Sequence, residues 1–122
     1  MKGYTTLGTN DLGRASKFYD ELLSEMGGGR VMENDRMVMW GTGEDKPTVA
    51  VLLPFDGQPA TVGNGSMLGI SCASHEEVDR VHAKALALGA QNEGAPGNRT
   101  DAFYGGYIRD LDGNKLVFFK MG

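Results

Sequence analysis

The sequence is poor in the residues that most often bind metals or carry out nucleophilic catalysis. Its 122 residues include two histidines and one cysteine. A single cysteine excludes an internal disulfide and a thiolate metal cluster. No stretch approaches the about 18 apolar residues of a membrane-spanning helix, and the amino terminus lacks the apolar run of a signal peptide. We therefore expect a cytoplasmic protein with no membrane partner.

Positive charge is also in short supply. Twelve Lys and Arg stand against 16 Asp and Glu, which gives a net charge of −4 and no basic stripe. Nucleic acid is therefore not expected as a partner, because binding to its phosphates requires clustered positive charge. Glycine is abundant, with 19 residues, where an average protein has about 7% glycine. Such a content is typical of short elements joined by many tight turns.

Two helices are predicted by apolar residues that recur at three- and four-residue steps. The first stripe spans 12–26 and follows a possible cap at Asn10 or Asp11. The second spans 78–88 and follows Ser74, with an acidic residue three positions later that completes a capping box. Glycines follow both stripes and end both helices.

Short apolar runs on either side of these helices predict strands. The expected strands are 4–9, 30–32, 36–40, 48–53, 67–72, 91–93, 103–109 and 115–121. A shift of 63 residues places Tyr4 on Met67 and aligns the two helices, so each half has the order strand, helix and three strands. The predicted fold is α+β. It is a single domain of two βαβββ modules, 1–56 and 66–122 with a joint at 57–65, whose curved mixed sheets surround a shared cleft.

Two motifs carry a resemblance to a known family. Asn-Asp-Leu at 10–12 is followed by Phe-Tyr at 18–19, and Arg-Asp-Leu-Asp-Gly-Asn-Lys fills 109–115. The chain resembles the vicinal oxygen chelate superfamily, also called glyoxalase/bleomycin-resistance/dioxygenase. Leu111 stands where that family commonly has proline. The resemblance implies the glyoxalase/bleomycin-resistance fold, a small-molecule ligand and a homodimer.

The resemblance also implies where a divalent metal, the family's usual cofactor, would bind. Its ligand positions fall on Tyr4, Met67 and Val117, and the remaining ligand would come from 48–55, which contains no acid, histidine or amide. Zn²⁺, Fe²⁺ and Mn²⁺ need imidazole and carboxylate ligands, which these residues do not supply. We therefore expect no metal cofactor.

Alternation along the strands assigns side chains to the face that the helices leave open. Pairing Arg109 with Lys115 across the turn puts Tyr107 opposite Val117. The expected ligand-binding residues are Tyr4, Trp40, Met67, Tyr107, Val117 and Phe119, with Arg109 at the rim. Aromatic rings offer stacking area and methionines adapt to irregular shapes, so the pocket suits an apolar or aromatic molecule.

Three functions remain open at this point. The first is metal-independent binding of a small molecule. The second is a lyase, isomerase or dioxygenase activity of the same superfamily, with an atypical metal site or none. The third is a structural or regulatory dimer without a ligand. The face of the strand at 36–40 that points into the cleft is also open, with Trp40 favoured, and Arg99 either reaches the groove or stays in water.

The second helix carries a stripe formed by His75, Asp79 and His82, at helical spacing. Such a stripe could hold zinc, but a solvated helix face is the favoured interpretation. The parity of Cys72 on its strand points into the core between helix and sheet, which predicts a buried and unreactive thiol.

Overall fold

The computed structural model describes residues 3–43 and 47–122, which repeat one pattern of elements twice. The first pattern comprises β1 (Thr5–Gly8), α1 (Leu12–Ser24), β2 (Gly29–Glu33), β3 (Met37–Gly41) and β4 (Pro47–Leu52). The second comprises β5 (Leu68–Ser71), α2 (His75–Ala87), β6 (Gln91–Thr100), β7 (Phe103–Arg109) and β8 (Lys115–Met121). The predicted α+β fold with two βαβββ modules is confirmed. Contacts divide the chain into two compact units, Met1–Val62 and Gly63–Gly122.

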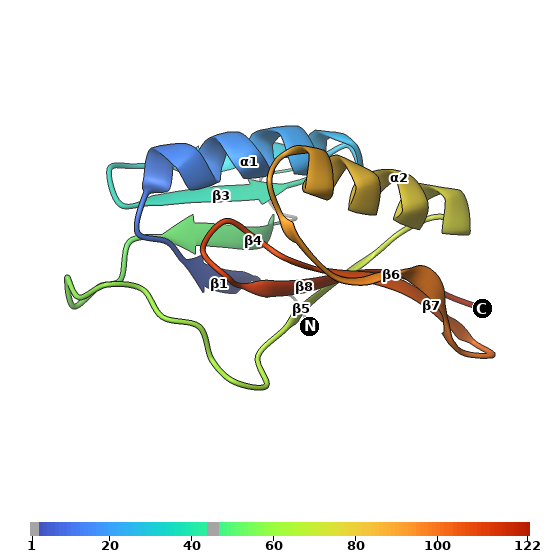
Figure 1. Cartoon of the computed structure of the whole chain (residues 1–122). Coiled ribbons are helices and arrows are strands. Elements are labelled where there is room, and N and C mark those ends of the chain that lie inside the picture. Colours follow the sequence, from blue (N-terminus) through green and yellow to red (C-terminus); the bar gives the residue numbers. More distant parts are fainter. Residues whose placement is uncertain (1–2, 44–46) are drawn as a thin grey trace. The chain divides into compact units, whose positions relative to one another are not determined.

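Each unit contains one mixed four-stranded sheet. The strand orders are β1-β4-β3-β2 and β5-β8-β7-β6. The first and last strands of each unit pair in parallel, and the other pairs are antiparallel. Within each unit the helix packs on one face of its own sheet, α1 on β2, β3 and β4 and α2 on β6, β7 and β8 (Figure 1). The other face of each sheet is therefore not covered by the unit's own helix.

Both helices begin at the caps that the sequence indicates. Asp11 caps α1, and its Oδ1 accepts a hydrogen bond from the backbone N of Arg14 at 3.0 Å. Ser74 caps α2, and its Oγ accepts from the backbone N of Glu77 at 3.1 Å. A glycine with positive φ follows each helix, as expected for a left-handed exit. No helix within the described ranges has the length and apolar character needed to cross a bilayer.

Trp40 lies on the helix-covered face of the first sheet. Its side chain is fully buried, its ring centroid is 5.6 Å from that of Tyr19 on α1, and its Nε1 donates to Oδ1 of Asp20 at 2.9 Å. The favoured orientation of Trp40, into the cleft, is wrong. The carboxylate on α1 offers the buried indole N–H the partner that it needs.

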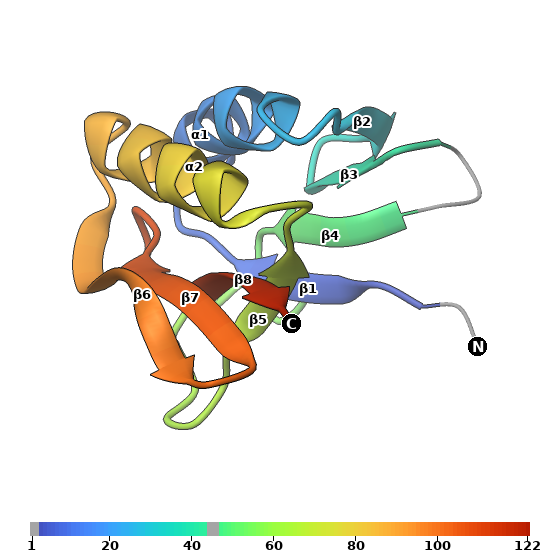
Figure 2. The same cartoon turned by 90° about the vertical axis from the view of Figure 1, so that its right-hand side faces the viewer.

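The strand β6 is longer than the sequence predicts. It covers Gln91–Thr100, whereas only 91–93 was expected. Its pairing with β7 shifts register three times, and it contains Pro96 between Gly94 and Gly97. An edge strand tolerates proline and bulges because one side of its backbone needs no ladder partner. Figure 2 shows β6 beside β7.

The hairpin of β7 and β8 has the predicted register. Arg109 pairs with Lys115 and Tyr107 with Val117. Asp110 Oδ1 accepts hydrogen bonds from the backbone N of both Asp112 and Asn114 at 2.9 Å, which holds the turn. The helix-covered face of the hairpin buries three side chains completely: Ile108, Leu116 and Phe118. The alternate residues therefore lie on the open face.

In the histidine stripe of α2, His75 and Asp79 are exposed, as predicted, and only His82 is buried against β7. His82 is buried, and its Nε2 donates to the carbonyl oxygen of Tyr107 at 3.1 Å. The Tyr104 hydroxyl donates to Asp79 Oδ1 at 2.6 Å, and the His75 ring stacks on Tyr104 with centroids 4.0 Å apart. The favoured interpretation is confirmed for His75 and Asp79 and wrong for His82, whose partner on β7 the helix sequence alone does not reveal.

Cys72 is buried, as predicted. Removal from water raises the pKa of its thiol to about 11. The thiolate is the reactive form of cysteine, so this side chain is an inert part of the core at neutral pH.

Candidate functional site

The open face of the second sheet carries two phenyl rings that lie nearly parallel. The centroids of Phe103 and Phe119 are 5.3 Å apart and the ring planes differ by 11°. Each ring covers a glycine of a strand: a Cβ on Gly105 would lie 2.8 Å from the Phe103 ring, and one on Gly69 would lie 3.2 Å from the Phe119 ring. The two glycines therefore give these rings the space to lie along the sheet.

Tyr107 and Val117 extend this surface. Their backbones pair across β7 and β8, and a Cβ on Gly94 of β6 would lie 3.3 Å from the Tyr107 ring. Val117 is 2% exposed, whereas the three rings are partly accessible. We call the four residues Phe103, Tyr107, Val117 and Phe119 the aromatic platform. It is a broad apolar surface whose rings can stack on a planar molecule.

Two cations lie against the Tyr107 ring of the platform. Arg99 Cζ is 5.2 Å from the ring centroid and Lys115 Nζ is 5.5 Å from it, both within cation–π range. Arg99 also donates from Nη1 to the Gly97 carbonyl at 3.0 Å and from Nη2 to the Ala95 carbonyl at 2.6 Å. Arg99 therefore contacts the open face at Tyr107 while it remains exposed to solvent.

Arg109 stands beside Lys115 at the end of β7. Its Nε donates to Glu93 Oε1 at 2.8 Å, and its Nη1 donates to the Gly113 carbonyl at 3.1 Å. Arg109 and Lys115 line a pocket of about 320 Å³. The other residues that line it are Asn64, Gly65, Ser66 and Met67. The pocket therefore joins cationic and neutral polar groups, with no acidic side chain among the described residues that line it.

Five of the seven predicted ligand-binding residues lie on or beside the second sheet, and the other two do not. Tyr107, Val117 and Phe119 lie on the platform, and Met67, which is 50% exposed, lines the pocket with Arg109. Trp40 is under α1. Tyr4 belongs to the first unit, immediately before β1, and is 56% exposed.

Sequence reasoning missed three contributors to this site. Phe103 shares the parity of Tyr107 on β7, so alternation alone could have placed it on the platform. The contact of Arg99 with Tyr107 had no signal in the sequence, because it depends on the bulges of β6. Lys115 was used to set the hairpin register, and its cation was not considered as a part of the site.

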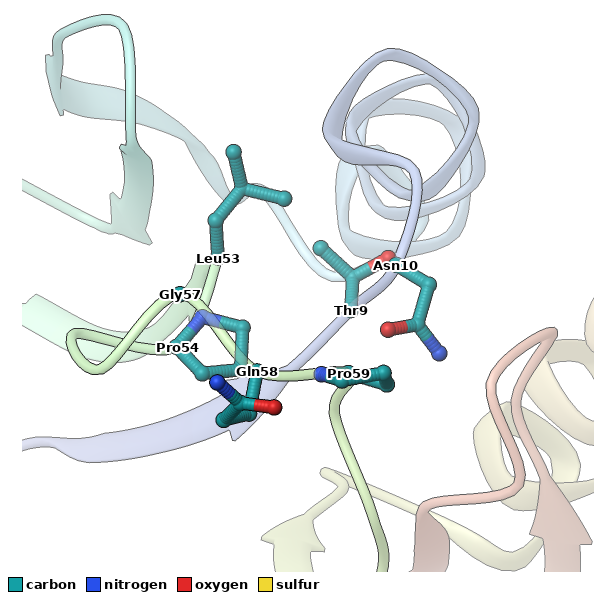
Figure 3. A pocket seen from close by; sticks show the side chains of 7 residues that line it. All are labelled: Thr9, Asn10, Leu53, Pro54, Gly57, Gln58 and Pro59. Atoms are coloured by element: carbon teal, nitrogen blue, oxygen red, sulfur yellow. The ribbon is translucent and has the colours of Figure 1, made fainter.

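A second cavity lies in the first unit (Figure 3). It measures about 310 Å³ and is lined by Thr9, Asn10, Leu53, Pro54, Gly57, Gln58 and Pro59. Asn10 Oδ1 accepts a hydrogen bond from the backbone N of Ala60 at 2.6 Å, which fastens the segment after β4 to the start of α1. Thr9 is fully buried, and its Oγ accepts from the backbone N of Asp11 at 3.0 Å. Both polar side chains bind nearby backbone groups, so their positions are explained by the local fold and do not indicate a ligand.

Comparison with known families gives a match over nearly the whole chain. Residues 3–118 match the model of the Glyoxalase/Bleomycin resistance protein/Dioxygenase superfamily. The chain belongs to this superfamily. A search of curated proteins gave no significant match.

Solved structures of this superfamily have the same fold. A glyoxalase/bleomycin resistance protein from Albidiferax ferrireducens T118 is 38% identical, with a TM-score of 0.87 over 98% of this chain and 97% of that one. A glyoxalase-related enzyme from Fulvimarina pelagi is 21% identical, with a TM-score of 0.77 over 98% and 87% of the two chains. Lactoylglutathione lyase from Agrobacterium tumefaciens is 21% identical, with a TM-score of 0.71 over 98% and 92%. The last two likenesses concern the fold alone.

The residues at the metal positions implied by the superfamily do not fit such a metal. Val117 is a buried hydrocarbon, Met67 offers a soft thioether and Tyr4 an exposed phenol. Mn²⁺, Fe²⁺ and Zn²⁺ favour imidazole and carboxylate donors. Across 3–43 and 47–122, no three His, Cys, Asp or Glu side chains come together as a metal-binding group.

Proposed function

We propose that this member of the superfamily binds a small planar or aromatic molecule on the aromatic platform, without a metal. The observation that carries the proposal is the arrangement of rings over glycines in the second sheet. Phe103 and Phe119 are stacked with nearly parallel ring planes, and the Cβ positions that would disturb them are left vacant at Gly69 and Gly105. A planar guest gains apolar contact area on such a surface with little reorganisation of the protein.

The chemistry of the metal positions supports the metal-independent part of the proposal. An apolar Val117 in place of a carboxylate removes a ligand and brings no charge to the platform. Binding on the platform relies on contact area and ring stacking, which need no ion.

A thermal-shift screen with planar aromatic metabolites and antibiotics tests the proposal, since a ligand that binds the folded state raises its unfolding temperature. The informative pair of variants is Phe119→Leu and Phe55→Leu. Both remove one ring, but Phe55 is 91% exposed and lies in the first unit, away from the platform residues in sequence and sheet. We expect a bound ligand to raise the unfolding temperatures of the parent protein and of Phe55→Leu equally. It should raise the unfolding temperature of Phe119→Leu much less.

Metal dependence is tested on the same protein before and after treatment with a chelator. We expect a ligand to shift the unfolding temperature by the same amount in the treated and untreated samples. Stoichiometric Fe, Zn, Ni or Mn in untreated protein, together with loss of ligand binding on its removal, would contradict the proposal and favour an enzyme with an atypical metal site. A complete lack of stabilising ligands would favour a structural or regulatory role.

A further inference from the structure

The charge around the platform differs in sign from that of the whole chain. The protein carries a net charge of −4, yet Arg99, Arg109 and Lys115 converge beside Tyr107 and the adjoining pocket. We call these three residues the cation cluster. One carboxylate, Glu93, contacts it through its ion pair with Arg109. The cluster therefore keeps a positive charge at the edge of an apolar surface.

The three cations differ in how their donors are used. Arg99 donates to two backbone carbonyls, and Arg109 donates to Glu93 and to the Gly113 carbonyl. Lys115 makes no ion pair with any residue in 3–43 or 47–122, and its contact is with the face of the Tyr107 ring. A cation–π contact leaves the donor hydrogens of an ammonium group able to bind an anion.

The pocket beside the platform has the composition of an anion site. Lys115 and Arg109 contribute charge, Asn64 and Ser66 contribute neutral polar groups, and no acid is among the described residues that line it. In the parallel pairing of β5 with β8, Gly69 lies opposite Val117, so Met67 just before β5 lies toward Lys115. The pocket and the platform are therefore adjacent parts of one face.

We propose that the ligand is an aromatic carboxylate, with its ring on the platform and its carboxylate in the pocket, held by Lys115 and Arg109. This inference rests on the proposed function and specifies the class of ligand. Lys115 makes no other ion pair among the described residues and can therefore pair with the carboxylate. Arg109 adds a second cation, two of whose donors already bind Glu93 and the Gly113 carbonyl. Charge-assisted hydrogen bonds favour such a ligand over a neutral molecule of the same shape.

The test uses two probes of equal shape, 2-naphthoate and 2-naphthamide, whose affinities are measured by calorimetry. We expect the carboxylate to bind the parent protein about tenfold more tightly than the amide. Lys115→Met should bring this ratio well below tenfold, because the carboxylate loses one of its two cations while the amide loses no ion pair. Added salt should weaken binding of the carboxylate much more than binding of the amide.

Lys120→Met is the matched control, because Lys120 lies on the same strand with the opposite parity and donates to the Met121 carbonyl. It removes the same net charge and should keep the tenfold ratio. Equal binding of the two probes to the parent protein would overturn the inference and leave the proposed function in place. An unchanged ratio in Lys115→Met, or the same loss in Lys120→Met, would also overturn it. Binding of neither probe would overturn the inference and the proposed function together.

Discussion

Asp20 on α1 holds together two groups that come from different strands. Its Oδ1 accepts hydrogen bonds from Trp40 Nε1 and from Arg30 Nε, both at 2.9 Å, and its Oδ2 accepts from Arg30 Nη2 at 2.7 Å. Asp20→Ala removes both acceptor oxygens and the charge of this side chain. We therefore expect the variant to lower the free energy of unfolding.

The magnitude follows from the exposure of each partner. Trp40 is fully buried, and leaving a buried donor without its partner costs about 1–3 kcal/mol. The Arg30 and Asp20 side chains are 37% and 39% exposed, so their ion pair is screened by solvent and contributes about 0.2–1 kcal/mol. The expected loss for Asp20→Ala is therefore about 2 kcal/mol, most of it from the indole.

Urea unfolding at neutral pH measures this loss, and Trp40, the only tryptophan, provides the fluorescence signal. Glu33→Gln is the control, because Glu33 also pairs with Arg30 but is not a partner of Trp40. We expect that control to lose less than about 0.5 kcal/mol. Equal losses in the two variants would refute the reasoning, since the effect would then come from the charge on Arg30 and not from the indole.

The same contact predicts a dependence on pH. Hydrogen bonds from Arg30 hold the pKa of the folded Asp20 carboxyl below its usual value, with a smaller effect in the same direction from Trp40. A carboxyl with a lowered folded-state pKa contributes stability above its unfolded pKa of about 4 and loses it as the pH falls through the folded value. The stability difference between the parent protein and Asp20→Ala should be constant near neutral pH and should narrow below about pH 4. A difference that widens on acidification would contradict this sign.

Two further predictions concern the second sheet. Gly105→Ala places a Cβ 2.8 Å from the Phe103 ring, so urea unfolding should show a loss of about 1–3 kcal/mol from overpacking; Gly29→Ala in β2, where no atom lies within 4 Å of the added Cβ, should show none. Cys72 should react with a thiol reagent at pH 8 only after unfolding, because the thiol is buried and its pKa is raised to about 11. Rapid labelling of the folded protein, or equal losses in the two alanine variants, would contradict these expectations.

The sequence predicted correctly those features whose contacts can be inferred from nearby residues of the chain. The hairpin register followed from the Asp-Gly-Asn turn and the alternation on both sides of it, and the pairing of Tyr107 with Val117 is confirmed. The repeated pattern of strands and helices in the sequence correctly predicted that the two halves have the same order of elements. The burial of Cys72 followed from its parity beside a predicted helix.

The errors arose where both faces of an element have the same chemistry, or where a partner is distant in sequence. Residues 37–40 are apolar on both faces, so alternation could not orient Trp40, and the deciding acceptor at Asp20 lies 20 residues away. His82 looked solvated until the Tyr107 carbonyl was seen beside it, 25 residues away. The contact of Arg99 with Tyr107 required the bulged course of β6.

The high glycine content has a second explanation besides turns. Gly69, Gly94 and Gly105 lie within strands, where glycine weakens a strand through its backbone entropy and its missing side chain. At each of these three positions the nearest side-chain neighbours include a ring of the platform. The contact area of the rings offsets part of the destabilisation that glycine brings. Alanine at these positions would improve strand propensity but would displace the rings, so the glycines are best explained by the space that the rings need.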